Sequence, residues 1–183
     1  MANDLSVFLK QLILRPREIS AAIPSSRRLA RMMADAVPDI TGSIAELGPG
    51  TGRMTQALLD KGARPQNLSL FEINAVFARH LTIKFPEVSV HNQSAQDMTA
   101  AGLNNLSAVV SGLPFLSIPL PIQREIIRAS FDVLAPNGVY IQFTYGRKLP
   151  IHPEIIEQHS LSAKRFGLVW GNLPPAQVLV FSR

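Results

Sequence analysis

The fold is decided by the stretch Ile44-Ala45-Glu46-Leu47-Gly48-Pro49-Gly50-Thr51-Gly52, an apolar run that ends in an acid and then passes through three alternate glycines. A helical pattern follows at once, with Met54, Leu58 and Leu59 on one side. Glycines allow backbone angles and close approach that a Cβ would block. A strand that feeds a glycine-rich turn and then a helix forms a ligand crevice at the carboxyl edge of a parallel sheet. The pattern therefore predicts an α/β fold with a binding site at this turn.

The spacing of the glycines distinguishes this turn from a dinucleotide site. In G-x-G-x-x-G the pyrophosphate sits at the helix N-terminus, but here Gly52 comes one residue early and Arg53 fills the dinucleotide position. The motif E-x-G-x-G-x-G, beginning at Glu46, resembles motif I of the Rossmann-like methyltransferases that bind S-adenosylmethionine. The alternative is a tight strand–helix turn that holds no ligand.

Two further acids follow predicted strands. Glu72 ends the run Leu68-Ser69-Leu70-Phe71 and lies twenty residues after Gly52. In this architecture an acid at the tip of the second strand accepts hydrogen bonds from both ribose hydroxyls. Asp97 follows a predicted strand over 88–91, at the position where the resembling methyltransferases accept a hydrogen bond from the adenine amino group. Each acid taken alone is also explained as a solvated loop charge.

The resemblance implies S-adenosylmethionine as cofactor and S-adenosylhomocysteine as its product. It also implies a seven-stranded, Rossmann-like class I methyltransferase sheet with helices on both faces and an N-terminal amphipathic helix. The residues that it assigns to the cofactor are Glu46, Gly48, Gly50, Gly52, Glu72, Ile73, Gln96, Asp97, Met98 and Ser111.

Length and composition fit one compact domain. The chain has 183 residues, enough for a substantial core, and we expect a single domain over 1–183, with an N-terminal helical extension at 1–36 and a catalytic core at 37–183. Further predicted elements are helices over 27–36, 74–84 and 122–134 and strands over 106–111, 139–145, 163–169 and 177–181. The chain contains no cysteine, so there is no disulfide or thiolate metal site, and we expect no metal.

The N-terminal segment carries most of the net positive charge. Residues 1–31 hold six basic and two acidic residues, a net charge of +4, whereas the remaining twelve basic and eleven acidic residues give +1. An apolar pattern at helical spacing runs through the same segment. The residues assigned to a membrane surface are Leu5, Phe8, Leu9, Lys10, Leu12, Ile13, Arg15 and Arg17.

Two interpretations of this helix remain open. It packs its apolar face on the domain, or it lies in the headgroup region of an anionic bilayer. No apolar run reaches the ~18 residues of a membrane span, and no basic region precedes the apolar stretch as in a secretory signal. We therefore expect a cytoplasmic monomer that associates peripherally with the inner face of the cell membrane.

The tip of the fourth predicted strand bears on the acceptor. Adenine N6-methyltransferases carry Asn or Asp before Pro-Pro-Tyr there, and ribosomal RNA adenine dimethylases carry Asn-Leu-Pro-Tyr or Phe, whereas this chain has Gly112-Leu113-Pro114-Phe115. Glycine offers no side-chain carbonyl to an adenine amino group. The sequence therefore disfavours base methylation and a nucleic-acid partner, and an enzyme like the ribosomal RNA adenine N6-dimethyltransferases remains the alternative.

Three short stretches together resemble the bacterial phospholipid N-methyltransferases. They are Ile23-Pro24-Ser25-Ser26, the run from Ser111 to Phe115, and Phe143-Thr144-Tyr145-Gly146. The resemblance implies methyl transfer to the headgroup amine of phosphatidylethanolamine, leading to phosphatidylcholine. The candidate substrate-binding residues are Ser26, Gly112, Leu113, Pro114, Phe115, Tyr145 and Arg147.

The chemistry of that reaction suggests roles for a few residues. The lipid amine, with a pKa near ~10 in water, must lose a proton before it attacks, and we expect that proton to pass to water with help from Tyr145 or the Ser111 hydroxyl. Phe115 and Tyr145 are candidates to hold the methylated ammonium by cation–π attraction, or they are ordinary core residues. Arg147 and Lys148 either meet the lipid phosphate or form a solvated pair. Ser26 either caps the following helix or helps to bind an anion.

Overall fold

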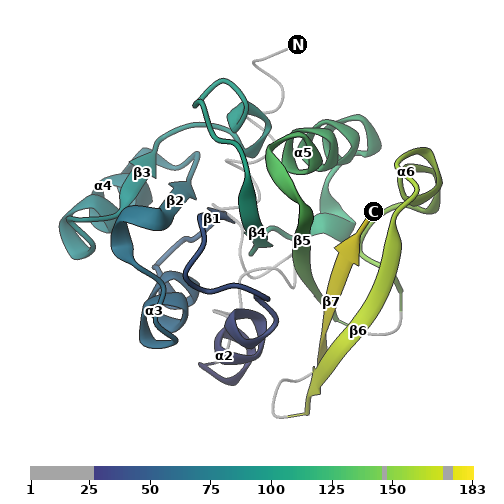
Figure 1. Cartoon of the computed structure of the whole chain (residues 1–183), viewed down its shortest axis with the longest axis horizontal. Helices are drawn as coiled ribbons and strands as arrows, with labels where there is room; N and C mark the ends of the chain where they lie inside the picture. Colours follow the sequence, from purple (N-terminus) through teal and green to yellow (C-terminus); the bar gives the residue numbers. More distant parts are fainter. Residues whose placement is uncertain (1–26, 146–147, 171–174) are drawn as a thin grey trace.

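The chain folds around one seven-stranded sheet with helices on both faces (Figure 1). The computed structural model describes residues 27–145, 148–170 and 175–183. In chain order the elements are α2 (Arg27–Asp35), β1 (Ile44–Leu47), α3 (Arg53–Asp60), η2 (Pro65–Asn67), β2 (Leu68–Phe71), α4 (Ala75–Lys84), β3 (Ser89–His91), η3 (Ala95–Asp97), β4 (Leu106–Ser111), η4 (Phe115–Ser117), α5 (Leu120–Val133), β5 (Leu134–Tyr145), α6 (Pro153–Gln158), β6 (Ser162–Val169) and β7 (Ala176–Ser182).

The strand order is β3-β2-β1-β4-β5-β7-β6. Strands β1 to β5 are parallel, and β7 inserts antiparallel between β5 and β6. The chain leaves β1 towards β2 on one side and later returns to β4 on the other, so β1 and β4 flank the topological switch point where α/β sheets bind ligands. The glycine turn follows β1 and therefore lies at that crevice.

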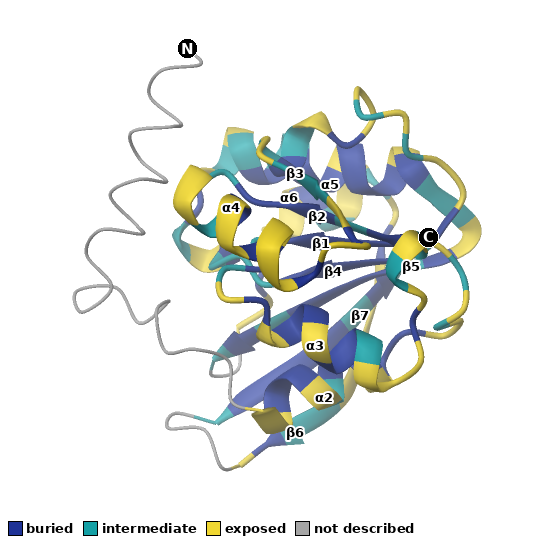
Figure 2. Ribbon diagram, turned by 90° about the vertical axis from the view of Figure 1, so that its left-hand side faces the viewer, coloured by how far each residue is buried: buried dark blue, intermediate teal, exposed yellow. Residues whose placement is uncertain are grey.

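Two hydrophobic cores flank the sheet (Figure 2). One lies under α2, α3 and α4 and includes Leu29, Leu58 and Leu81. The other lies under η3, α5 and α6 and includes Ile127 and Ile155. Because both faces are covered, the inner strands are largely apolar, and all four residues of β1, Glu46 included, are buried.

Within the described residues, the predicted helices and strands agree with the structure to within a few residues, apart from the start of β5, the helix α6 and the three short 3-10 helices. The predicted N-terminal helix lies outside the described residues. β5 begins at Leu134 rather than 139, and its pairing with β4 slips between Leu106 and Ala108. The helix α6 was not predicted. It has only six residues, too few for a helical period to stand out, and the His152 ring accepts a hydrogen bond from the Glu154 N–H at its start.

Candidate functional site

The glycine turn is built from left-handed backbone and close contacts. Gly48, Gly50 and Gly52 have φ values of 66°, 54° and 78°, angles that other residues adopt only with strain. A Cβ on Gly48 would lie 2.7 Å from Leu113 Cδ2, and one on Gly52 would lie 2.5 Å from Phe85 Cε2. A Cβ on Gly50 would meet nothing within 4 Å. The two outer glycines are therefore needed for packing, while the middle one borders open space.

Glu72 joins the tips of β1 and β2. Its Oε2 accepts a hydrogen bond from the Gly50 N–H at 3.0 Å, and its Oε1 accepts one from the Asn74 N–H at 2.8 Å. The Asn92 amide donates to the Glu72 carbonyl at 2.8 Å and so attaches the segment after β3 to the same tip. Burial raises the pKa of Glu72, and its hydrogen bonds to backbone N–H groups partly offset that rise. The structure thus brings the predicted ribose-binding acid directly to the glycine turn.

Glu46 lies one step deeper, at the base of the same turn. It is 1% exposed, and its Oε2 accepts a hydrogen bond from the Thr55 hydroxyl of α3 at 2.7 Å. Its Oε1 is buried and has no hydrogen-bond partner among the described residues. Burial raises the pKa of Glu46 to about 8, and the charge of Glu72 adds to the rise. Buried polar atoms are nearly always paired, so a ligand that brings positive charge or a donor to this turn would suit Glu46.

The loop after β4 closes the other side of the crevice. The Gly112 N–H donates to the Leu47 carbonyl at 2.8 Å, and a Cβ on Gly112 would lie 2.9 Å from the Gly48 carbonyl oxygen. The Gln142 amide of β5 donates to the Leu113 carbonyl at 2.9 Å. The predicted substrate loop and the glycine turn are therefore in direct contact, with Leu113 and Pro114 half-buried at their junction.

The third predicted acid lies apart from these contacts. Asp97 is exposed, and its carboxylate accepts a hydrogen bond from the Ser94 N–H within a capping box. Gln96 is half-buried and accepts a hydrogen bond from the Ser94 hydroxyl. Met98 is fully buried in the core under α5, and its assignment to the cofactor stays a prediction. Ile73 is half-buried, next to Glu72.

Two other predicted residues also belong to the core. Phe115 is 2% exposed and packs against the ring of Tyr140 at 6.0 Å, so it is not open to a lipid amine. Ser111 is fully buried, and its hydroxyl accepts a hydrogen bond from the Leu113 N–H at 3.3 Å. Neither side chain is exposed, and the assignments of Phe115 to the substrate and of Ser111 to the cofactor and to proton transfer stay predictions. Tyr145 is half-buried at the end of β5, with its ring 5.6 Å from that of Phe143.

The remaining predicted residues lie outside the described ranges. They are Ser26, Arg147 and the proposed membrane-binding set Leu5, Phe8, Leu9, Lys10, Leu12, Ile13, Arg15 and Arg17. Among the residues that are described, no helix has the length and apolar character needed to cross a membrane. The described residues also contain no cluster of three or more histidine or acidic side chains suited to a metal.

The structure adds functional side chains that the sequence analysis did not single out. The Thr55 hydroxyl donates to the Glu46 carboxylate, the Asn92 amide donates to the Glu72 carbonyl, and Gln142 holds the loop after β4. The Asn74 side chain caps α4 while its N–H donates to the Glu72 carboxylate. The sequence offers only a weak indication of these roles, because Gln142 is a glutamine within a mostly apolar predicted strand. Thr55 and the two asparagines look like ordinary helix and loop residues.

Comparison with solved structures identifies the architecture. A TehB-like S-adenosylmethionine-dependent methyltransferase from Corynebacterium glutamicum superimposes with a TM-score of 0.67 at 15% identity, over 95% of this chain and 97% of that one. The chain has the class I methyltransferase fold. A glycopeptide N-methyltransferase, MtfA, solved with S-adenosylmethionine, gives a TM-score of 0.66 at 12% identity, over 88% of this chain and 95% of that one. The predicted seven-stranded methyltransferase sheet is therefore confirmed, and S-adenosylmethionine as cofactor is consistent with these neighbours.

Sequence comparison supplies a relative with a narrower activity. An ornithine lipid N-methyltransferase from Singulisphaera acidiphila is 29% identical over 182 residues, which cover 95% of this chain and 93% of the relative. No family model matches the chain. The resemblance to lipid N-methyltransferases drawn from the short motifs thus extends over nearly the whole methyltransferase fold.

Proposed function

We propose that this protein uses S-adenosylmethionine to methylate the headgroup amine of a membrane lipid. The observation that carries the proposal is the 29% identity, over 95% of the chain, to a lipid N-methyltransferase. The fold supports it independently, because the glycine turn and two buried carboxylates meet at the switch point of a class I methyltransferase sheet.

The residues present fit this cofactor. S-adenosylmethionine supplies an electrophilic methyl group on a positively charged sulfonium. Glu72 would accept hydrogen bonds from ribose hydroxyls, since each carboxylate oxygen retains a lone pair beyond its bond to the backbone. Gly50 leaves room for the ligand beside it. The unpartnered Oε1 of Glu46 would find its electrostatic complement in a cationic ligand.

The acceptor that we propose is phosphatidylethanolamine and its methylated forms, which lead to phosphatidylcholine at the membrane surface. An ornithine lipid, the acceptor named for the relative, is an amine of similar chemistry and is the first alternative. The amine must be neutral to attack, and a neighbouring sulfonium favours the neutral form. We propose that Tyr145, which is half-buried at the tip of β5, lies beside the methylated ammonium and attracts it through the face of its ring.

A parallel methyl-transfer assay tests this proposal. The purified protein is given labelled S-adenosylmethionine together with phosphatidylethanolamine, ornithine lipid or ribosomal RNA, and the products are separated by chromatography and mass spectrometry. We expect label in methylated phosphatidylethanolamine. Label in ornithine lipid alone would identify ornithine lipid as the acceptor in place of phosphatidylethanolamine. Label in RNA alone would refute the proposal that the acceptor is a lipid.

A matched pair of variants separates cofactor binding from the acceptor. Glu72→Gln replaces the carboxylate that would accept hydrogen bonds from the ribose with a neutral amide. Hydrogen bonds to a charged group contribute about 1.5–3 kcal/mol, so calorimetry should show roughly ten- to hundredfold weaker cofactor binding. Glu87→Gln makes the same chemical change at an exposed residue that contacts Gln66, and binding should stay as in the parent protein. Equal affinities for the two variants would contradict the assignment of Glu72.

A further inference from the structure

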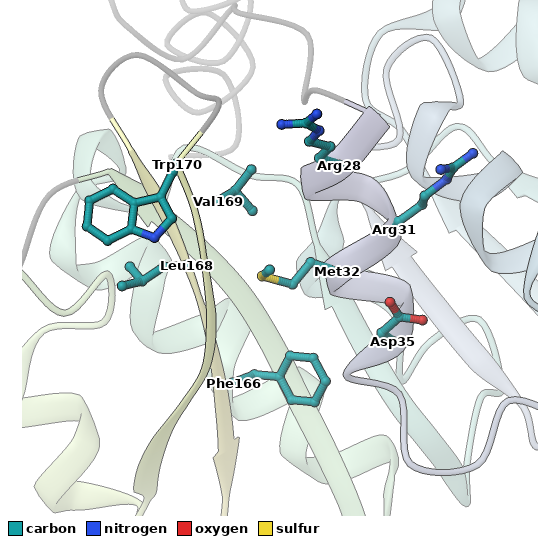
Figure 3. Close-up of a pocket in the computed structure, with 8 residues that line it drawn as sticks. All are labelled: Arg28, Arg31, Met32, Asp35, Phe166, Leu168, Val169 and Trp170. Carbon is teal, nitrogen blue, oxygen red and sulfur yellow. The ribbon is translucent and has the colours of Figure 1, made fainter.

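A groove outside the glycine turn runs between α2 and β6 (Figure 3). Its volume is about 520 Å³. Four apolar side chains, Met32, Phe166, Leu168 and Val169, form much of its wall, and Trp170 stands at one end. The polar residues that line it are Arg28, Arg31 and Asp35, all from α2.

The groove opens at the same edge of the sheet as the glycine turn. In the strand register Tyr145 pairs with Ala176, and Ala176 pairs with Val169, so the end of β6 lies level with the end of β5. The side chain of Met32 packs on Gly167, where a Cβ would lie 2.7 Å from the sulfur. Arg28 is one helical turn further towards that edge. The groove therefore faces the same side of the molecule as the proposed active site, with β7 between β6 and the strand that carries Tyr145.

The aromatic residues at the groove are unusually exposed for their size. Trp170 is 76% exposed and Phe166 is 48% exposed, although each carries a large apolar surface. Tryptophan is enriched where one side of a residue meets hydrocarbon and the other meets water. Exposed apolar groups gathered beside cationic groups indicate a surface that is covered by a partner.

Positive and negative charges lie at opposite ends of the groove. Arg28 and Arg31 are exposed, and neither forms an ion pair within the described parts of the chain. Arg28 extends over the end of the groove that holds Val169 and Trp170, whereas Asp35 lies at the opposite end beside Phe166 (Figure 3). Asp35 already has a cation, Lys61, at 3.6 Å. The end of the groove at the carboxyl edge of the sheet, where Arg28 lies, is therefore positive and suits an anion.

We propose that the groove between α2 and β6 docks an anionic phospholipid of the bilayer surface, with Arg28 at the phosphate and Trp170 and Phe166 among the acyl chains. The inference rests on the proposed lipid-methylating function and names the surface that meets the membrane. It involves residues separate from the predicted membrane-binding set between Leu5 and Arg17. Apolar burial and attraction to anionic lipid act together in such surfaces.

The chain offers a direct probe, because Trp170 is its single tryptophan. The full-length protein, without cofactor, is mixed with vesicles of phosphatidylethanolamine and phosphatidylglycerol or with vesicles of phosphatidylcholine alone. Tryptophan emission is recorded, and quenching is measured with lipids brominated on the acyl chain. We expect a blue shift and quenching with the anionic vesicles and little change with the neutral ones.

Two pairs of variants test the two parts of the surface. Arg28→Glu should weaken binding to anionic vesicles at least about fivefold, whereas Arg64→Glu, the same charge change before β2 at the opposite edge of the sheet, should have a much smaller effect. Phe166→Ser should reduce the quenching of Trp170. Ile83→Ser, at a residue 73% exposed on α4, should leave it unchanged.

The outcomes distinguish this inference from the function on which it rests. Vesicle binding without any change in Trp170 emission would overturn the inference, as would equal losses for Arg28→Glu and Arg64→Glu. Quenching of Trp170 by RNA but not by vesicles would also overturn it. Because the readout requires no cofactor and no turnover, a catalytically inactive preparation that still shows acyl-chain quenching would refute only the proposed reaction.

Discussion

At the scale of single residues, two glutamates share one buried site at the glycine turn. Glu46 and Glu72 are 1% and 4% exposed, and the pKa of each is raised by burial. Glu72 has two backbone N–H donors at its oxygens. Glu46 has the Thr55 hydroxyl at one oxygen and, in the part of the chain that the structure describes, no partner at the other. A cationic ligand would favour the ionised form of both, so cofactor binding and proton release should be coupled.

The pKa of Glu46 predicts how stability depends on pH. The folded protein holds this proton up to about pH 8, whereas the unfolded chain releases it near 4.5. Between these values the native state binds more protons, so the free energy of unfolding should fall as pH rises, by up to about 5 kcal/mol from this group. Denaturant titrations of the cofactor-free protein should show that fall, and Glu46→Gln should flatten it.

The control for this prediction is Glu87→Gln, an exposed change that should keep the slope of the parent protein. A slope that Glu46→Gln leaves unchanged would mean that Glu46 is ionised in the folded protein. Glu72, whose pKa is also raised, should keep part of the slope in the Glu46→Gln variant.

Gly112 is required by the packing of the loop after β4 against the glycine turn. A Cβ there would lie 2.9 Å from the Gly48 carbonyl oxygen. Gly112→Asn, which restores the side chain of adenine methyltransferases, should therefore lower the free energy of unfolding by about 1–3 kcal/mol without adding adenine methylation. Leu116→Asn introduces the same residue at a 54% exposed position of the loop after β4 and should cost much less in thermal denaturation. Adenine methylation by Gly112→Asn would show that the loop can move to admit the side chain.

At the scale of elements, a buried polar network ties β5 to the loop after β4. The Tyr140 hydroxyl donates to Gln142 Oε1 at 3.0 Å, and Gln142 Nε2 donates to the carbonyls of Leu113 and Phe143 at 2.9 and 3.0 Å. Burial raises the pKa of Tyr140, so its hydroxyl stays protonated and keeps donating. Gln142 therefore positions the loop that meets the glycine turn.

Replacing Gln142 should cost more than replacing Tyr140. Gln142→Leu keeps the approximate size of the side chain but leaves buried oxygens without donors, at about 1–3 kcal/mol each. Tyr140→Phe removes one hydroxyl and should cost about 1 kcal/mol. Chemical denaturation measures both effects, and cofactor affinity measured alongside should fall only for Gln142→Leu if the loop is displaced. Equal stability losses would indicate that the loop is held by its apolar contacts instead.

Helices and strands with a clear hydrophobic period were predictable from the sequence. Strand boundaries that depend on pairing with a neighbouring strand were not. The alternating and apolar runs of β2, β4 and β7 lie where the pattern placed them, because both faces of each strand are covered. The early start of β5 depends on β4, to which its first residue pairs across a slip in register. No property of residues 134–138 alone specifies that pairing.

At the scale of the whole molecule, one edge of the sheet gathers the functional features. The glycine turn, Glu72, Tyr145 and the positive end of the α2–β6 groove all lie at the carboxyl ends of strands. Antiparallel insertion of β7 makes β6 run parallel to β5, so Trp170 emerges at this edge. The molecule therefore presents its proposed catalytic and lipid-contacting surfaces in one direction.

The net charge of +5 predicts that vesicle binding depends on salt. Screening shortens the range of charge interactions from about 10 Å at 0.1 M salt to about 3 Å at 1 M. Co-sedimentation with anionic vesicles should therefore weaken steadily as salt is added, while cofactor binding in the buried turn should change little. Vesicle binding that does not respond to salt would assign the attachment to apolar contacts alone.

The sequence by itself determined the class of fold and the ligand crevice, because three alternate glycines after a buried strand, and an acid at the next strand tip, act through local backbone geometry. The sequence did not determine which side chains near the strand ends face the crevice and which pack into the core. Met98 and Phe115 lie after predicted strands, as Glu72 does, yet the folded chain packs them into the core under α5, whereas the Glu72 carboxylate faces the glycine turn. The groove between α2 and β6 could not be predicted from the sequence either. Its lining residues, such as Arg28 and Trp170, lie more than 130 positions apart in the chain. Only tertiary packing brings such residues together, because burial depends on what covers a side chain from elsewhere in the chain.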